Sequence, residues 1–273
     1  MQEDVAARLP GGAAVFALQE VGRGEDRPEL QTLLQAGYKL IRLRGGKDTV
    51  IAIDKKKFKR IEDHSFPLPV EDDREAEIAV AIAIDAKTKK KVAFVSVHIP
   101  GFALEEAGEE ERHLGAGTGD TVSTQIAQRL RTLCQGCDRV IVGGDFNASR
   151  EIHDPRFQLW EKAGFNTYSP EEITNVVHDP KLSRQLHERT LDHLLVWEKY
   201  QDAEKTEKKP GLFDKMASVF KSHTGKPTKY MATTQGPFQP GSSPMTSYSD
   251  HTPVYLMERV SQVTKRPFKL LRG

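Results

Sequence analysis

The chain has 273 residues, of which 37% are hydrophobic, so it can bury the core of one large domain or of two small ones. Its 40 basic and 39 acidic side chains nearly cancel, which excludes the strong overall positive charge by which many proteins attract nucleic acid. It has no apolar run of about 18 residues and no basic start followed by an apolar segment, so we expect neither a membrane span nor a secretory signal.

Strands dominate the first half of the chain. The apolar residues 13–21 predict a buried strand, and residues 27–38 predict a helix with a proline in its first turn. Further strands are predicted at 38–43, 49–54, 77–85 and 91–99, and a polar turn joins the last two in a hairpin.

Helices and strands alternate in the second half. Residues 120–134 predict a capped amphipathic helix, followed by a strand at 139–145 and a helix at 155–165. Two more strands are predicted at 190–197 and 252–260. Hairpins mixed with helical crossovers favour an α/β architecture of stacked sheets flanked by helices.

Two segments interrupt this pattern. Residues 100–120 are acidic and rich in glycine, which predicts a loop near the end of a strand. Residues 199–247 are polar and rich in lysine, and within them residues 211–221 have one apolar helical face. That piece is either a lid packed on its own domain or a helix that contacts a membrane surface or a partner.

The only two cysteines, Cys134 and Cys137, form a C-x-x-C pair. A redox-active pair usually opens a helix, and a zinc site needs two further ligands. This pair closes a predicted helix ahead of a strand, which favours a structural role.

Polar side chains stand at the ends of four predicted apolar strands, and Asp192 with His193 lie inside a fifth. Those at the strand ends are Glu20, His98, Asp145 with Asn147, and Asp250 with His251. Each alone is ordinary on a protein surface, whereas the five together are far less expected by chance. Because strand ends can bring distant parts of a chain to one pocket, we expect these clusters to form one site.

The residue types suit hydrolysis of a phosphate ester. Glu20 and Asp250 offer hard carboxylate oxygens of the kind that bind Mg²⁺ or Mn²⁺. The histidines can bind or protonate phosphate oxygens, and the pair Asp145 and Asn147 can deprotonate and orient a water. Together they describe metal-assisted attack of water on phosphorus.

In these motifs the chain resembles the endonuclease/exonuclease/phosphatase superfamily of metal-dependent phosphoesterases, which includes deoxyribonuclease I and the exonuclease III type of abasic-site endonuclease. The motifs, in order between Ala13 and Val260, are "ALQEV", "FVSVHIPG", "IVGGDFNAS", "RTLDHLLV" and "SDHTPVYL". The resemblance implies a four-layer α/β sandwich, two packed mixed β-sheets flanked by helices, with the site at one rim. It implies one domain over residues 1–273, with insertions at about 100–120 and 199–247.

The resemblance also implies how metal and water are held. Glu20 would be the principal ligand of Mg²⁺, or of Mn²⁺, and Asp250 would face the same ion. Asp145 would activate the attacking water, with Asn147 beside it.

Four further residues match positions that act on the phosphate. His98 would contact the phosphate, as in the deoxyribonuclease-like, sphingomyelinase-like and 5-phosphatase members; the abasic-site endonucleases lack this histidine. His251 would bind the scissile phosphate or shuttle a proton, and Asp192 would hold its tautomer. Arg74, ahead of the strand at 77–85, would touch the phosphate or be a solvated strand end.

One family feature is missing from this sequence. Members normally begin with a strand that ends in an asparagine, which supports the metal site. Here the first residues, "EDVAARL" at 3–9, match the helix that follows that strand. Either this sequence starts after that strand, or the protein has lost the strand and its asparagine. The second possibility motivates a non-enzymatic alternative, a scaffold on a degenerate nuclease fold.

The substrate is expected by elimination. The "WxGDxN" and "PAWCDR" signatures of the inositol-polyphosphate 5-phosphatases are absent. A deoxyribonuclease-like endonuclease is therefore the first hypothesis, and nucleic acid the favoured partner. A phosphoinositide phosphatase or sphingomyelinase-like enzyme, contacting a membrane through 211–221, is the alternative.

Two further expectations concern the lysine-rich parts of the surface and the location of the protein. Lysines at 55–57 and 87–91 could flank a nucleic-acid groove or only solubilise strand edges. We expect a monomer that is cytoplasmic or delivered without a classical signal peptide.

Overall fold

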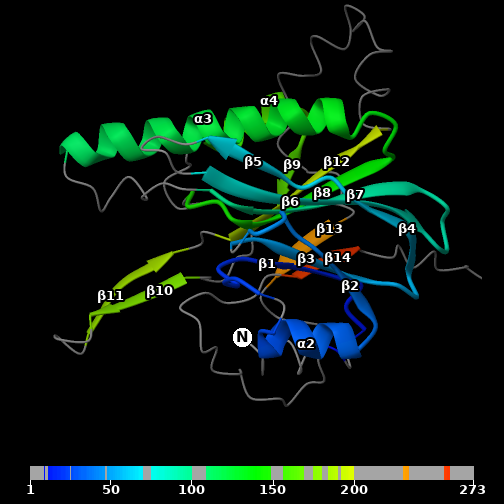
Figure 1. Ribbon diagram of the computed structural model, residues 1–273. Helices are drawn as coiled ribbons and strands as arrows, with labels where there is room; N and C mark the ends of the chain where they lie inside the picture. Colours follow the sequence, from blue (N-terminus) through cyan, green and yellow to red (C-terminus); the bar gives the residue numbers. More distant parts are fainter. Residues whose placement is uncertain are drawn as a thin grey trace, which may run out of the picture.

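The computed structural model describes residues 9, 12–24, 26–46, 48–69, 75–99, 109–148, 156–168, 175–179, 184–189, 192–199, 230–233 and 255–258. Within these ranges only the backbone is described at 109–120, 175–179, 184–189, 192, 230–233 and 255–258. The described elements stack in layers (Figure 1).

The first layers are a helix and a small antiparallel sheet. The sheet has the order β1 (Val15–Leu18), β3 (Val50–Asp54) and β2 (Tyr38–Ile41). Helix α2 (Pro28–Gln35) lies along its outer face (Figure 1). The helix starts with proline because the missing N–H and fixed φ of proline suit a first turn.

The large sheet is mixed and has seven strands. They are β4 (Phe58–Asp63), β5 (Phe66–Pro69), β6 (Glu75–Asp85), β7 (Lys91–His98), β8 (Arg139–Asp145), β9 (Asn166–Tyr168) and β12 (Asp192–Glu198). The order is β4-β6-β7-β8-β12-β9, with β5 also paired to β6. Only β7 and β8 run parallel, and the crossover between them contains α3 (Glu109–Leu133).

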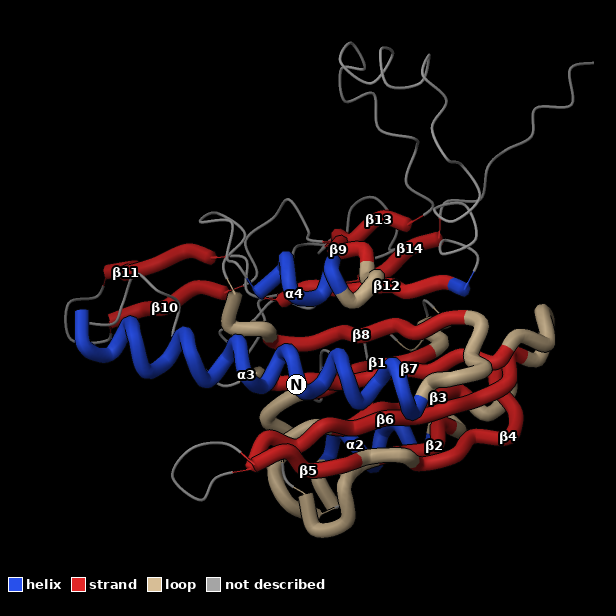
Figure 2. Tube along the Cα trace, turned by 90° about the horizontal axis from the view of Figure 1, so that it is seen from above, coloured by secondary structure: helices blue, strands red, loops and turns tan. Residues whose placement is uncertain are grey.

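Two pairs of strands lie outside these sheets. They are β10 (Asn175–Asp179) with β11 (Arg184–Arg189), and β13 (Tyr230–Thr233) with β14 (Tyr255–Glu258). Helices α3 and α4 (Arg156–Lys162) cover the face of the large sheet that is turned away from the small sheet (Figure 2). The order helix, sheet, sheet, helix is the predicted four-layer sandwich.

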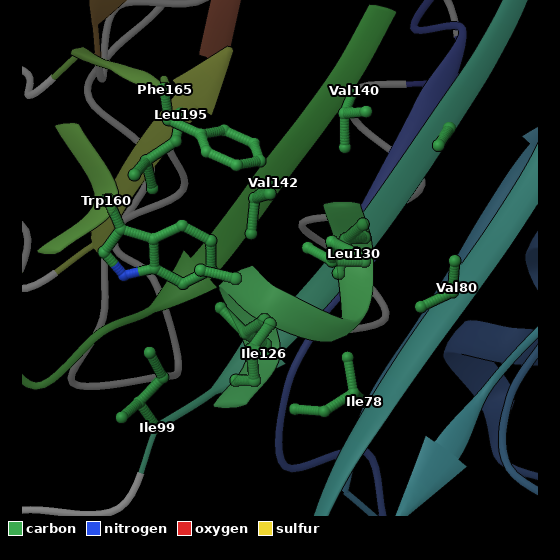
Figure 3. Close-up of a cluster of buried hydrophobic side chains, with 14 of the residues drawn as sticks. Ile78, Val80, Ile99, Ile126, Leu130, Val140, Val142, Trp160, Phe165 and Leu195 are labelled. Atoms are coloured by element: carbon green, nitrogen blue, oxygen red, sulfur yellow. The ribbon is translucent and has the colours of Figure 1, made fainter. Parts of the chain in front are cut away.

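Three apolar layers hold the four structural layers together. Side chains alternate between the two faces of a strand, and β6 shows this pattern plainly. Ile78 and Val80 join the cluster under α3, which also contains Ile126, Leu130 and Trp160 (Figure 3). The intervening alanines of β6 face the small sheet, and a third cluster joins that sheet to α2.

The structure corrects some details of the sequence prediction. The small sheet is antiparallel in all its described strands, whereas both sheets were expected to be mixed. Residues 100–120 were predicted to form a loop. This prediction is wrong for residues 109–120, because α3 begins at Glu109. Three glycines lower the helix propensity there, but the helix extends from an amphipathic half that is already buried.

Other expectations have simpler outcomes. Cys134 and Cys137 are both buried at the turn from α3 to β8, as their context predicts. Their mutual hydrogen bond and burial raise the pKa of the Cys134 thiol, which disfavours its reactive thiolate. No described helix is long and apolar enough to cross a bilayer. The amphipathic piece 211–221 lies outside the described residues.

Candidate active site

Three strand ends meet at one rim of the large sheet. β7 ends at His98, which is paired in register with Asp145 at the end of β8. β12 begins at Asp192, which is paired with Asp145 from the other side. The topology therefore brings together three of the sequence-predicted positions that lie far apart in the chain.

A tight turn after β8 arranges the motif "GDFN". The backbone N–H of Asn147 donates to Oδ1 of Asp145 at 2.7 Å, and its Nδ2 donates to Oδ2 at 3.2 Å. Asn147 has a φ of 45°, so the two side chains meet through a turn that follows the strand. Phe146 points the other way, into the core against Trp160 and His193.

His98 is held between two acids from different sheets. Its Nδ1 lies 3.0 Å from Oδ1 of Asp48, and its Nε2 lies 3.7 Å from Oδ2 of Asp145. Burial alone lowers the pKa of His98, but the hydrogen bond to Asp48 and the charges of Asp48, Asp145 and Glu20 outweigh it and raise the pKa. The surroundings of His98 therefore favour its protonation more than water does.

Glu20 adjoins this pair on the small sheet. It follows β1, is exposed, and has a φ of 55°, a left-handed backbone that non-glycine residues rarely adopt. Its N–H donates to Oδ1 of Asp48 at 3.3 Å, and the N–H of Val21 donates to the carbonyl of Asp48 at 3.2 Å. Strained backbone persists where the surroundings over-determine it, which is common at functional sites.

We call Glu20, Asp48, His98, Asp145 and Asn147 the polar rim. The two sheets approach closely behind it, where the side chain of Gln19 donates to Ser96 at 2.8 Å. Gly144 of β8 lies beside this contact, and a Cβ there would lie 2.0 Å from the carbonyl oxygen of Val97 on the neighbouring strand β7 and 3.0 Å from Nε2 of Gln19.

Buried side chains support the turn from behind. Arg156, at the start of α4, donates to the carbonyls of Phe146 and Asn147. The Nε2 of His193 donates to the carbonyl of Ala148 at 2.8 Å, and its ring packs against Phe157. His193 is thus a core histidine, whereas its neighbour Asp192 lies at the rim.

Sequence reasoning missed Asp48 and Arg156. Asp48 lies in the loop before β3, where an acid is ordinarily solvated, and it belongs to none of the sequence motifs. Because β3 runs antiparallel to β1, its first residues lie beside the last residues of β1. Arg156 carried no signal, because an arginine in a predicted helix is normally solvated.

Part of the predicted site lies outside the described residues. Arg74, Asp250 and His251 belong to that part, and of Asp192 only the backbone is described. The structure therefore brings together Glu20, His98, Asp145 and Asn147 and leaves the other four predictions untested.

A divalent ion would find hard oxygen donors at the polar rim. No group of three histidine, cysteine or acidic side chains among the described residues is arranged to hold a metal ion. The exposed carboxylate of Glu20 nevertheless fits Mg²⁺ or Mn²⁺ chemically, since Mg²⁺ is usually held by one or two carboxylates and keeps several waters.

The lysine runs lie at the opposite rim. Lys55–Lys57 follow β3 and Lys87–Lys91 precede β7, and the N–H of Ala86 donates to the carbonyl of Lys57 at 2.8 Å. β7 separates Lys91 from His98 by roughly 23 Å at its rise of about 3.3 Å per residue. These lysines therefore do not flank the polar rim.

Comparison with known proteins confirms the expected fold. An endonuclease/exonuclease/phosphatase protein from Bacteroides vulgatus superposes with a TM-score of 0.55 at 14% identity, over 72% of this chain and 77% of that one. A mannosyl-6-phosphatase from Bacteroides thetaiotaomicron gives 0.52 at 17%, over 72% and 75%. The human Nocturnin catalytic domain with bound sulfate gives 0.50 at 16%, over 71% and 74%.

No protein-family model matches the sequence, and no curated protein matches it. At these identities the structural similarity establishes the fold and nothing finer. The chain has the four-layer fold of endonuclease/exonuclease/phosphatase structures.

Proposed function

We propose that this protein is a divalent-metal-dependent phosphodiesterase that hydrolyses its substrate by attack of water on phosphorus. One observation carries the proposal. Where the two sheets meet, His98 lies between Asp48 and Asp145. Asn147 donates to Asp145, and the backbone of the neighbouring Glu20 donates to Asp48. A rigid rim of this kind can position water and phosphate together.

Asp145 is the candidate general base. Its side chain is only 10% exposed, and both of its oxygens accept hydrogen bonds from Asn147. These bonds fix the carboxylate at the rim, within reach of a water on the phosphate. The Nδ2 of Asn147 also donates to the carbonyl of Ile99 at 3.0 Å, which leaves its amide oxygen to orient that water.

His98 is the candidate phosphate-binding group. With Nδ1–H donating to Asp48, the ring orientation is set and Nε2 faces the rim. The raised pKa keeps the ring protonated more often than in free histidine, so that it can donate to a phosphoryl oxygen.

Glu20 would hold the divalent ion, Mg²⁺ or Mn²⁺, with Asp250 facing it. When bound, the ion would neutralise charge on the phosphoryl oxygens. Asp192, His251 and Arg74 keep the roles that the family resemblance implies, as orienting acid, phosphate or proton-transfer group, and phosphate contact.

Nucleic acid remains the favoured substrate by elimination, because the signatures of the inositol-polyphosphate 5-phosphatases are absent from the sequence. The lysine runs lend no support, because they lie at the opposite rim. Lipid phosphoesters stay as the alternative, and a non-catalytic scaffold as the second alternative.

A substrate panel tests the proposal. Supercoiled plasmid, single-stranded DNA and RNA, phosphoinositide vesicles, sphingomyelin vesicles and the diester bis-p-nitrophenyl phosphate are incubated with Mg²⁺, Mn²⁺ or EDTA. We expect metal-dependent cleavage of the diester and of a nucleic acid. Glu161→Gln, an exposed acid on α4, serves as the control for Asp145→Asn.

The outcomes separate the hypotheses. If the protein cleaves lipid but not nucleic acid, the nucleic-acid substrate is wrong, whereas metal-dependent phosphodiester hydrolysis is retained. If no substrate in the panel is hydrolysed in a metal-dependent way, the non-catalytic scaffold is the hypothesis that remains.

A further inference from the structure

Arg42 links the two loops that carry the acids of the small sheet. It follows β2, and its Nη1 donates to the carbonyl of Gly24 at 3.1 Å. Its Nη2 donates to the carbonyls of Gly22 at 2.9 Å and of Gly46. One guanidinium therefore ties the loop after Glu20 to the loop before Asp48.

The loop contacts leave Glu20 little freedom. On its N-terminal side Glu20 donates to Oδ1 of Asp48, and on its C-terminal side Val21 donates to the carbonyl of Asp48. Next along the chain, the carbonyls of Gly22 and Gly24 accept hydrogen bonds from Arg42. Arg42 thus closes the segment whose strained residue is Glu20.

Asp48 is fixed from the other side as well. Its N–H donates to Oε2 of Glu77 at 2.8 Å, and the hydroxyl of buried Thr49 donates to the carbonyl of Glu77 at 2.8 Å. The loop that Arg42 binds through Gly46 is therefore anchored to the large sheet through β6. Because Arg42 also binds Gly22, it connects the loop after Glu20 to this anchored loop.

The guanidinium suits this task and a lysine does not. Arginine presents five N–H donors in a rigid fork, so it can bind three carbonyls at once. No described carboxylate pairs with Arg42, and its recorded partners are all backbone oxygens. Its function is consequently geometric and not the neutralisation of an acid.

We propose that Arg42 is a positioning residue that holds Glu20 in its left-handed conformation for binding a divalent cation. This inference rests on the proposed function, because it takes Glu20 as the cation ligand. Residues that orient a ligand from outside commonly change metal affinity by about 10- to 100-fold.

The test is Mn²⁺ binding, measured by isothermal titration calorimetry on wild type, Arg42→Met, Arg42→Lys and Arg44→Met. Arg44 is the matched control, since it lies exposed in the same loop and makes no recorded hydrogen bond to a described residue. We expect at least a roughly tenfold weaker affinity for both Arg42 variants and wild-type affinity for Arg44→Met. Circular dichroism verifies that each variant is folded. If Arg42→Met does not fold, the Mn²⁺ affinity of Arg42→Lys alone tests the proposal.

Glu20→Gln distinguishes failure of this inference from failure of the proposed function. If Glu20→Gln binds Mn²⁺ like wild type, the assignment of the ligand fails and the role of Arg42 fails with it. If Glu20→Gln loses binding while the Arg42 variants keep wild-type affinity, only the role of Arg42 is overturned. Wild-type affinity in Arg42→Lys alone would also overturn it, since charge and not the fork would then suffice.

Discussion

His98 and Asp48 come from different sheets and meet at the rim, with Nδ1 of the imidazole 3.0 Å from Oδ1 of the carboxylate. Each side chain is about one quarter exposed. The pair joins the two sheets by a polar contact at the place where the apolar cluster between them ends. It also fixes which nitrogen of His98 faces Asp145.

This contact makes stability depend on pH. The folded-state pKa of His98 is raised above its ordinary 6.5, although burial opposes the rise. A raised folded-state pKa stabilises the protein fully below the unfolded pKa, and this stabilisation is lost as the pH rises through the folded pKa. Wild type is therefore expected to lose free energy of unfolding relative to His98→Gln as the pH rises from 6.5 through the folded-state pKa of His98.

Urea unfolding in EDTA, at several pH values, measures this difference. EDTA removes any cation that would alter the charge around Glu20. A gap between wild type and His98→Gln that stays constant across the range, or widens as the pH rises, would show that His98 gains no stabilising charge from Asp48.

Gly144→Ala is expected to destabilise the fold by roughly 3 kcal/mol or more. A methyl group there would meet the carbonyl of Val97 at 2.0 Å, on the strand that carries His98. Gly136 is the matched control, because it also has a positive φ but a Cβ there would meet nothing within 4 Å. Gly136→Ala should cost only about 1 kcal/mol, and equal costs in chemical denaturation would contradict the close approach.

His193→Phe is expected to lower stability by about 1–3 kcal/mol, because the carbonyl of Ala148 loses a buried donor. The ring can still pack against Phe157. His64→Phe, at a partly exposed histidine, should change stability little. If urea unfolding gives the same midpoint for His193→Phe and wild type, His193 does not support the turn.

The sequence was sufficient for the layers and for the positions at strand ends. Apolar runs and their turns predicted β1, β3, β6, β7, β8 and β12, and the residue types at their ends predicted Glu20, His98, Asp145 and Asn147. These signals are local, because strand periodicity and polar residues after apolar runs are readable within a few residues.

Contacts between distant loops were not predictable in the same way. Asp48 pairs with a histidine 50 residues away, and Arg42 binds carbonyls of a loop some 20 residues away. Neither contact leaves a periodic pattern. Strands β4 and β5 were missed because their exposed faces carry charges and prolines that weaken the strand signal.

The most direct test of the central claim is the hydrolysis rate of bis-p-nitrophenyl phosphate by wild type and Asp145→Asn, each with Mg²⁺, Mn²⁺ and EDTA. Asparagine retains one acceptor oxygen for the turn, so the fold should persist. We predict cation-dependent hydrolysis by wild type and a loss of about 10²-fold or more in kcat for Asp145→Asn. Equal rates in wild type and a folded Asp145→Asn, or hydrolysis unaffected by EDTA, would contradict the account.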